Sequence, residues 1–352
     1  MIAIVAYDLF VKALVLEEYK RFAYKDVPDP RVGPGEVLIA VKACGICGSD
    51  VHGMDGSSGR RQPPIIMGHE AAGLIAEAGA GVEGWEPGQR VTFDSTIYCG
   101  ECWHCRRGQI NLCDNRRVLG VSCDEYRQHG AFAEYVAVPA RILYALPEGV
   151  NFAQAAMVEA LSVAVHGIRR TALDLNDSAL VVGAGNIGLL ALQVLKTAGC
   201  SPVIAADIDP ARLELARKLG ADLVINSKDL EVGREVRRHV ARGVDVAVEA
   251  VGIGDSLKDA VSALRKGGSL TVIGNLAPEV IFPVQAVVTR EINVNGSCAS
   301  SGEYPTCLEL IGRGAVDVDA LISATAPLAE GAAWFQRLYQ AERGLMKVVL
   351  RP

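Results

Sequence analysis

The sequence lacks three features: a long apolar run, a long run of like charge, and enough cysteines for a disulfide scaffold. Its apolar stretches fall well short of the ~18 residues that a membrane-spanning helix needs, so we expect no membrane partner. The net charge of −6 is spread along the chain, which argues against a nucleic-acid partner. The apolar start has no basic segment and no small-residue cleavage site, so no signal peptide is expected.

Ten cysteines in 352 residues indicate a reducing compartment, the cytoplasm, with metal-binding or catalytic roles for the thiols. The length predicts two domains, and no internal repeat or low-complexity segment complicates that division.

The predicted organisation is α/β. Residues 1–157 are rich in Gly and Pro, with short strand-like runs such as "EVLIAVKA", and indicate a β-rich domain. A helix is expected over "FAQAAMVEALSVAVHGIRR". Strands then alternate with helices, which predicts a doubly wound parallel sheet over 158–294. Residues 295–352 are expected to return to the first domain.

A dinucleotide site is predicted at "LVVGAGNIG", where Gly183, Gly185 and Gly188 form a G-x-G-x-x-G between an apolar strand and an apolar helix. Asp207 follows Gly188 by 19 residues and ends the next expected strand. A carboxylate there accepts hydrogen bonds from the ribose hydroxyls and repels a 2′-phosphate, so NAD is favoured over NADP. Further residues expected to line the coenzyme site are Ile187, Arg212, Ile273, Gly274, Asn275 and Ser297.

Four cysteines lie close together in "YCGECWHCRRGQINLC", with two, two and seven residues between them: Cys99, Cys102, Cys105 and Cys113. This density suits a closed tetrahedral zinc site, which has no open position and is therefore structural. An iron–sulfur cluster is the competing interpretation.

A second, open metal site is indicated by "CGICGSDVH" and "IMGHEAAG", which offer thiols and the adjacent pair His69 and Glu70. Adjacent residues on a regular strand point to opposite faces, so joint ligation by this pair needs a bend. Glu159, on the expected helix, is a further candidate. A catalytic zinc needs about three protein ligands and one exchangeable position.

These motifs, together with "GAFAEYV" and "VGAGNIG", resemble the zinc-dependent medium-chain dehydrogenase/reductase family over nearly the whole chain. Within it, "VEALSVAVH" is similar to the polyol branch of sorbitol and galactitol-1-phosphate dehydrogenases. The resemblance implies a GroES-like catalytic domain with a structural zinc lobe, beside a Rossmann domain that binds NAD. Two zinc ions per chain and a homo-oligomer, with a tetramer favoured and a dimer as the alternative, are implied as well.

The resemblance also implies the site residues. Cys47, His69 and Glu70 hold the catalytic zinc, and Glu159 either binds it directly or holds its water. Cys44 is then a small buried bystander. Zinc acts as a Lewis acid that lowers the pKa of a substrate hydroxyl. The resulting alkoxide gives hydride to the nicotinamide.

The proton is expected to leave by a relay. The resemblance makes the Ser49 hydroxyl its first station, and His52 is expected to pass the proton towards solvent. His129, His166 and His239 are expected to be packing or solvent-facing residues.

The expected reaction is the reversible NAD-linked oxidation of a secondary alcohol of a polyol, sugar alcohol or sugar-alcohol phosphate to the ketone. L-Threonine, glucose-type and inositol or aminocyclitol dehydrogenases stay open as alternatives. A non-enzymatic nucleotide-binding protein, like the zinc-free crystallin relatives, is disfavoured because those relatives lack the metal residues present here.

The chain departs from the sorbitol type at several places. Gly53 stands where those enzymes have an aromatic residue after the relay histidine, and Ala299 and Ser300 replace an Arg-Tyr pair. The ten residues before Val11 resemble an extension. Four arginines are available to a phosphate but are expected to be solvated: Arg60, Arg61, Arg116 and Arg117.

Overall fold

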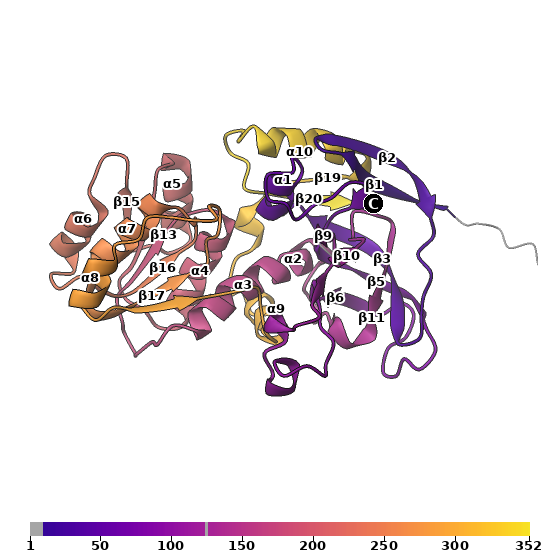
Figure 1. Cartoon of the computed structure of the whole chain (residues 1–352), viewed down its shortest axis with the longest axis horizontal. Helices are drawn as coiled ribbons and strands as arrows, with labels where there is room; N and C mark the ends of the chain where they lie inside the picture. The colour runs from indigo at the N-terminus through magenta and orange to yellow at the C-terminus, as the bar shows by residue number, and fades with distance from the viewer. Residues whose placement is uncertain (1–9, 124–125) are drawn as a thin grey trace, which may run out of the picture. The chain divides into compact units, whose positions relative to one another are not determined.

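The computed structural model describes residues 10–123 and 126–352, which form two compact units (Figure 1). Unit 1 comprises the described residues up to Glu159 together with Asp319–Pro352, and unit 2 comprises Ala160–Val318. The second boundary therefore follows Val318, beyond the expected position at 294. Most of the extension predicted at residues 1–10 lies outside the described residues.

Unit 1 is built on a seven-stranded sheet around β3 (Glu36–Gly45). This strand pairs antiparallel with β5 (Glu70–Ala78), β11 (Tyr135–Pro139) and the last strand, β20 (Lys347–Arg351). The C-terminal segment thus returns to the first unit, as expected. Because β3 is central in the sheet, most of its side chains are buried rather than alternating.

The other strands of unit 1 are mostly short. They are β1 (Phe10–Glu18), β2 (Arg21–Pro28), β4 (Ile65–Ile66), β6 (Arg90–Phe93), β7 (Thr96–Ile97), β8 (Arg117–Val118), β9 (Val121–Cys123), β10 (Tyr126–Gln128), β12 (Leu143–Ala145) and β19 (Ile322–Pro327). Its helices are α1 (Gly48–Gly53), α2 (Phe152–Ala156) and α10 (Gly331–Tyr339), with 3₁₀ turns at Cys105–Arg107, Ile110–Leu112, Ala140–Ile142, Asp319–Leu321 and Leu328–Glu330.

The helix expected over residues 152–170 is two helices, α2 and α3 (Val158–Arg169). A capping box starts α2, in which Asn151 Oδ1 accepts the backbone N–H of Gln154 at 2.9 Å. The chain turns at Met157 before α3 begins. The sequence pattern did not reveal this break, because apolar residues continue through both helices.

Unit 2 contains a six-stranded sheet whose paired neighbours are all parallel, in the order β15-β14-β13-β16-β17-β18. This is the doubly wound fold that the alternation predicted. The strands are β13 (Ala179–Val182), β14 (Val203–Asp207), β15 (Leu223–Asn226), β16 (Val244–Glu249), β17 (Leu264–Val272) and β18 (Asn293–Gly296). The helices are α4 (Asn186–Thr197), α5 (Pro210–Lys218), α6 (Val232–His239), α7 (Gly254–Ala263), α8 (Val284–Thr289) and α9 (Tyr304–Gly312).

Every residue of β13 and β14 is buried, as expected for parallel strands covered on both faces. The strand order reverses between β13 and β16, so ligands are expected beyond the carboxyl ends of these strands. None of the helices in the described part of the chain is both long and apolar enough to cross a membrane.

Residues 295–318 stay in unit 2 because polar contacts hold them there. His166 of α3 pairs with Glu303, which precedes α9, at 2.9 Å. Farther along, the Gln193 side chain accepts the Asp317 backbone N–H at 2.7 Å and donates to its carbonyl at 3.2 Å. His166, expected to be a packing or solvent-facing residue, is half-buried and packs against a carboxylate partner that lies 137 residues away.

Candidate metal and coenzyme sites

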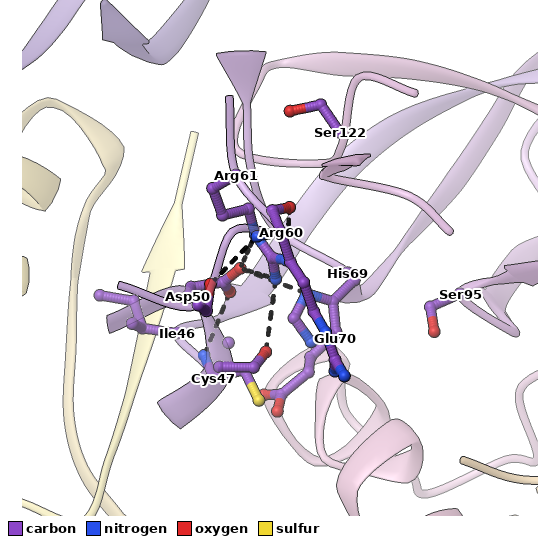
Figure 2. Close-up of polar contacts among 12 residues, drawn as sticks. Ile46, Cys47, Asp50, Arg60, Arg61, His69, Glu70, Ser95 and Ser122 are labelled. Atoms are coloured by element: carbon purple, nitrogen blue, oxygen red, sulfur yellow. Dashed lines mark hydrogen bonds and ion pairs between the residues drawn. The ribbon is translucent and has the colours of Figure 1, made fainter. Parts of the chain in front are cut away.

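Cys47, His69 and Glu70 come together in unit 1, with one ligand atom from each lying within 4.8 Å of the others (Figure 2). Cys47 is the N-cap of α1, His69 lies in the turn before β5, and Glu70 is the first residue of that strand. One soft and two harder ligands suit an open zinc site, in which a fourth, exchangeable group completes the shell.

Two glycines explain how adjacent residues can face the same site. Gly68 has φ +94°, which supplies the bend before His69, and a Cβ there would lie 2.9 Å from Cys44 Sγ. A Cβ on Gly45 would lie 2.3 Å from Glu70 Oε2, so this glycine makes room for the carboxylate. Cys44 is fully buried, as expected of a bystander, and burial raises the pKa of its thiol well above the usual range.

Asp50 contacts one of the three predicted metal ligands, His69. It is completely buried, and its Oδ1 lies 3.4 Å from His69 Nδ1 (Figure 2). Burial alone would lower the pKa of His69, but the charges of Asp50 and Cys47 raise it well above its usual range. A carboxylate facing Nδ1 directs Nε2 towards a metal, the usual arrangement around a zinc-bound histidine. The sequence motif "CGSD" contains Asp50, but its role was missed.

Lys347 of β20 was also missed. Its Nζ donates to Glu70 Oε1 at 2.7 Å, to Oε2 at 2.6 Å and to the Ile46 carbonyl at 3.2 Å. The lysine is 2% exposed, and its charge balances the Glu70 carboxylate in a region screened from water. The sequence shows only that Lys347 begins the apolar run "KVVL", which indicates burial of the lysine. It does not predict that the partner is Glu70, 277 residues away.

Glu159 lies near these residues but is not part of the three-ligand cluster. The Ser95 hydroxyl donates to its Oε1 at 3.4 Å. Burial raises the pKa of Glu159 to about 7. This position suits the expected water-holding role better than direct ligation.

Ser49 and His52 both lie on α1, three residues apart and both exposed. This spacing places them on one side of the helix. In the described part of the chain no hydrogen bond joins the two side chains. A substrate, coenzyme or water is therefore needed to link them.

The four-cysteine lobe forms as expected, with one sulfur from each cysteine within 4.8 Å of the other three. The Sγ atoms of Cys99 and Cys105 lie 3.9 Å apart, and those of Cys99 and Cys113 lie 3.5 Å apart. Sulfurs arranged tetrahedrally around one zinc lie about 3.8 Å apart, given Zn–S bonds of about 2.3 Å. An iron–sulfur cluster would hold them farther apart, so the geometry favours a single ion.

Backbone N–H groups around the lobe point at the sulfurs. Cys102 N donates to Cys99 Sγ at 3.4 Å, and Cys105 N donates to Cys102 Sγ at 3.5 Å. Backbone donors, with that of Glu101 first, lower the pKa of the Cys99 thiol to about 6. Burial raises the pKa of the Cys105 thiol to about 12 and also raises that of Cys113, so the backbone donors favour the thiolate at Cys99 alone.

In unit 2, the glycine-rich turn lies at the carboxyl end of β13. Gly183 has φ +95°, Gly185 is the N-cap of α4, and a Cβ on Gly188 would lie 1.7 Å from the Gly183 carbonyl oxygen. The N-terminal N–H groups of α4 directly follow this turn, the arrangement of a pyrophosphate site. Asn186 Oδ1 is buried there, without a hydrogen-bond partner among the described residues.

Asp207 ends β14 and braces this turn. Its Oδ2 accepts the Ala184 N–H at 2.6 Å, and its Oδ1 accepts the Asp209 N–H at 2.8 Å. Each oxygen keeps a further lone pair for a ribose hydroxyl. The Arg212 guanidinium lies beside Gly185, 4.0 Å from where a Cβ would stand.

The remaining residues expected at the coenzyme follow the carboxyl ends of neighbouring strands. Ile273, Gly274 and Asn275 come after β17, and Ser297 comes after β18. A Cβ on Gly274 would lie 2.2 Å from the Gly252 backbone nitrogen, which shows how closely two loops approach here. Ser297 Oγ is buried without a hydrogen-bond partner in the described part of the chain.

Comparison with known proteins identifies the family to which this chain belongs. The family model of the alcohol dehydrogenase GroES-like domain matches residues 33–148, and that of the zinc-binding dehydrogenase matches residues 186–313. The chain is 32% identical over 347 residues to the sorbitol dehydrogenase of Bacillus subtilis (strain 168), with 97% of each chain covered. The chain belongs to the zinc-binding alcohol dehydrogenase family.

Solved structures of this family share its fold. A zinc-binding dehydrogenase from Sinorhizobium meliloti 1021 bound to NADP matches with a TM-score of 0.90 at 30% identity, covering 98% of this chain and all of that one. Galactitol-1-phosphate dehydrogenase from Escherichia coli matches with a TM-score of 0.89 at 26% identity, covering 97% and 100%. The predicted family and fold class are confirmed, and the protein is a zinc-dependent oxidoreductase.

Proposed function

We propose that the protein is an NAD-linked polyol dehydrogenase that reversibly oxidises a secondary alcohol of a polyol, sugar alcohol or sugar-alcohol phosphate to the ketone. The convergence of Cys47, His69 and Glu70 within 4.8 Å is the observation that carries this proposal. Similarity to sorbitol and galactitol-1-phosphate dehydrogenases, over 97% of the chain in each case, supports the substrate class.

The residues divide the work as follows. Cys47, His69 and Glu70 would hold a zinc ion, which supplies Lewis acidity that lowers the pKa of the substrate hydroxyl. Asp50 fixes the His69 ring, and Lys347 balances the charge of Glu70. Ser49 Oγ accepts the substrate's hydroxyl proton as it releases its own, and His52 passes the released proton on to solvent.

The coenzyme is proposed to be NAD because Asp207 lies at the end of β14 with its carboxylate beside the glycine turn. A 2′-phosphate would meet this negative charge. The relative from Sinorhizobium meliloti is bound to NADP, so the preference needs its own test.

The protein is further proposed to form a homo-oligomer, a tetramer or a dimer. β18 is the edge strand of the unit 2 sheet, and this strand and the chain leading to it carry exposed apolar side chains: Leu276, Ile281, Val284, Val288 and Val294. An apolar edge of this kind favours pairing with a second copy.

We also propose a cytoplasmic location. Four cysteines form the lobe, and Cys44, Cys47, Cys200 and Cys307 are not in disulfides in the described part of the chain, which suits a reducing compartment. Recovery of the native protein outside the cytoplasm after cell fractionation would contradict this location.

One panel tests the reaction. Reduction of NAD is measured with polyols, their phosphates, inositols, aldoses and L-threonine as substrates. The highest kcat/KM is expected with a polyol or a polyol phosphate. A clear preference for L-threonine, an aldose or an inositol would replace the proposed substrate class.

The Cys47→Ala protein tests the metal site. Turnover should be lost while the coenzyme still binds, as measured by a titration of NADH fluorescence, because the dinucleotide residues lie in unit 2. Near-normal turnover in this variant would contradict the proposed chemistry.

A further inference from the structure

Arg61 is a buried arginine beside the candidate metal site. Its side chain is 3% exposed, although it was expected to be a solvated residue. Nη2 donates to Asp50 Oδ1 at 2.8 Å, and Nε lies 3.3 Å from the same oxygen (Figure 2). Nη2 also donates to Ser49 Oγ at 3.4 Å. Nη1 donates to the Arg60 carbonyl at 3.2 Å. The sequence expectation failed because the partner of Arg61 lies in a different segment.

The contact with Ser49 limits how that hydroxyl can act. A guanidinium only donates hydrogen bonds and stays protonated, so Ser49 Oγ must be the acceptor in this contact. One lone pair of the oxygen then faces Arg61, and the hydroxyl hydrogen points elsewhere. The other lone pair remains for a proton from the substrate. Arg61 thus sets the direction of the serine hydroxyl without taking part in proton transfer.

The contact with Asp50 reaches the metal ligands. Asp50 Oδ1, which accepts from Arg61, also lies 3.4 Å from His69 Nδ1, and Oδ2 accepts the Cys47 N–H at 3.4 Å. A buried carboxylate without a cation is strongly disfavoured, so Arg61 keeps Asp50 in place between two predicted ligands.

Gly53 is the residue that makes room for Arg61. A Cβ at position 53 would lie only 2.5 Å from Arg61 Cγ and 3.4 Å from Arg61 Cβ. The arginine stem therefore fills the space next to α1, where the sorbitol-type enzymes have an aromatic residue in the sequence. Positions 53 and 61 are therefore sterically coupled.

We propose that Arg61 is a positioning residue for the proton-exit path: it orients the Ser49 hydroxyl and anchors Asp50, and it requires glycine at position 53. This inference rests on the proposed function, because it assigns Arg61 to the relay that begins at Ser49.

The central variant is Arg61→Lys, which keeps the positive charge for Asp50 but lacks a fork that can reach two oxygens. For the best polyol of the substrate panel we expect kcat to fall about tenfold, with KM within about twofold of wild type, since proton transfer rather than binding is impaired. Zinc content and melting temperature should stay close to wild type. Arg60→Lys is the matched control, because Arg60 is exposed, and it should keep wild-type kcat.

A double-mutant cycle separates positioning from general structural support. If Arg61 acts through Ser49, adding Arg61→Lys to Ser49→Ala should lower kcat little further, because the oriented hydroxyl is already gone. If the two losses multiply, Arg61 acts independently of the relay and the proposal is overturned.

Gly53→Ala provides a second route if Arg61→Lys does not fold. The added methyl must displace the arginine stem, while alanine itself suits a helix better than glycine. We expect the same loss of kcat at constant KM. Wild-type kcat in either folded variant, while Ser49→Ala is slow, overturns the role of Arg61 alone. Wild-type kcat in Ser49→Ala overturns the proposed relay as well.

Discussion

At the residue scale, the candidate sites depend on side chains whose partners are far away in the sequence. A sequence motif predicts His69 and Glu70 as metal ligands, but it does not predict the side chains that hold these ligands in place. Lys347 reaches Glu70 across 277 residues, and Arg61 reaches Asp50 across 11. Both contacts are buried ion pairs. Removing one member of such a pair leaves an uncompensated buried charge, which costs about 3–5 kcal/mol.

The coenzyme preference is a property of one carboxylate. We expect Asp207→Ala to reduce the ratio of kcat/KM for NAD over NADP by about tenfold, because the charge that repels a 2′-phosphate is removed. Steady-state kinetics with both coenzymes measure the ratio. Asp209→Ala is the control: Asp209 caps α5 through the Ala211 N–H at 2.8 Å, and its loss should leave the ratio unchanged. An unchanged ratio in Asp207→Ala would argue against its proposed role.

At the element scale, glycines and caps decide which residues meet. Gly68 turns the chain before β5, and Gly183 turns it after β13, each with a φ that L side chains rarely adopt. The turn at Gly183 was predicted from its motif. For His69 and Glu70 the sequence predicted only that a bend is needed, and the structure shows that Gly68 supplies it. The split of one expected helix into α2 and α3 could not be foreseen, since the apolar pattern continues through Met157.

The cysteine lobe is expected to hold one of two zinc ions per chain. In Cys99→Ala, metal analysis by mass spectrometry should find about one zinc, because the closed shell loses a ligand. Cys298→Ala should retain two, since Cys298 lies outside both ligand clusters. Two zinc ions in the Cys99→Ala protein would contradict the assignment of the lobe.

The contact between α3 and the start of α9 should make stability depend on pH. Burial alone would raise the pKa of Glu303, but hydrogen bonds from His166 and the Ser301 backbone lower it below 4.5. A lowered carboxyl pKa stabilises the fold above about pH 4.5, and this contribution is lost as the pH falls through the lower folded pKa.

Glu303→Gln should therefore be destabilised by about 2 kcal/mol at pH 7, the usual contribution of a hydrogen bond to a charged group. The difference from wild type should shrink in acid. Chemical denaturation across pH checks both statements. Glu309→Gln, an exposed change on α9, should have little effect at any pH. A destabilisation of Glu303→Gln that is constant from pH 7 to pH 3 would contradict this account.

At the scale of the whole molecule, the chain forms two units, each with its own core and its own predicted site. Unit 1 carries both metal clusters, and unit 2 carries the dinucleotide turn. The return of the chain through β20 completes unit 1, because Lys347 comes from that last strand. A truncation before residue 347 would remove both a sheet strand and the partner of Glu70.

The proposed oligomer is testable through the edge of unit 2. Ile281 and Val288 are 93% and 68% exposed, so Ile281→Asp with Val288→Asp should not disturb the fold of one chain. Light scattering after size exclusion should show a smaller assembly than wild type. The introduced carboxylates make the formerly apolar edge charged, and a charged edge resists pairing. Leu175→Asp, at a residue that is 90% exposed outside residues 276–294, is the control and should leave the mass unchanged. A monomeric wild-type protein would remove the proposal.

The sequence by itself determined the doubly wound sheet, the glycine turn with Asp207, the dense cysteine lobe and the motifs that carry the family resemblance. These features are local, because periodicity, spacing and turn chemistry act over a few residues. Only the tertiary structure decided which of the four arginines is buried, that His166 has a carboxylate partner and that Lys347 faces Glu70. Those contacts depend on β20 pairing with β3, on α3 meeting the start of α9, and on the space left by Gly53, and each joins segments that no local pattern connects.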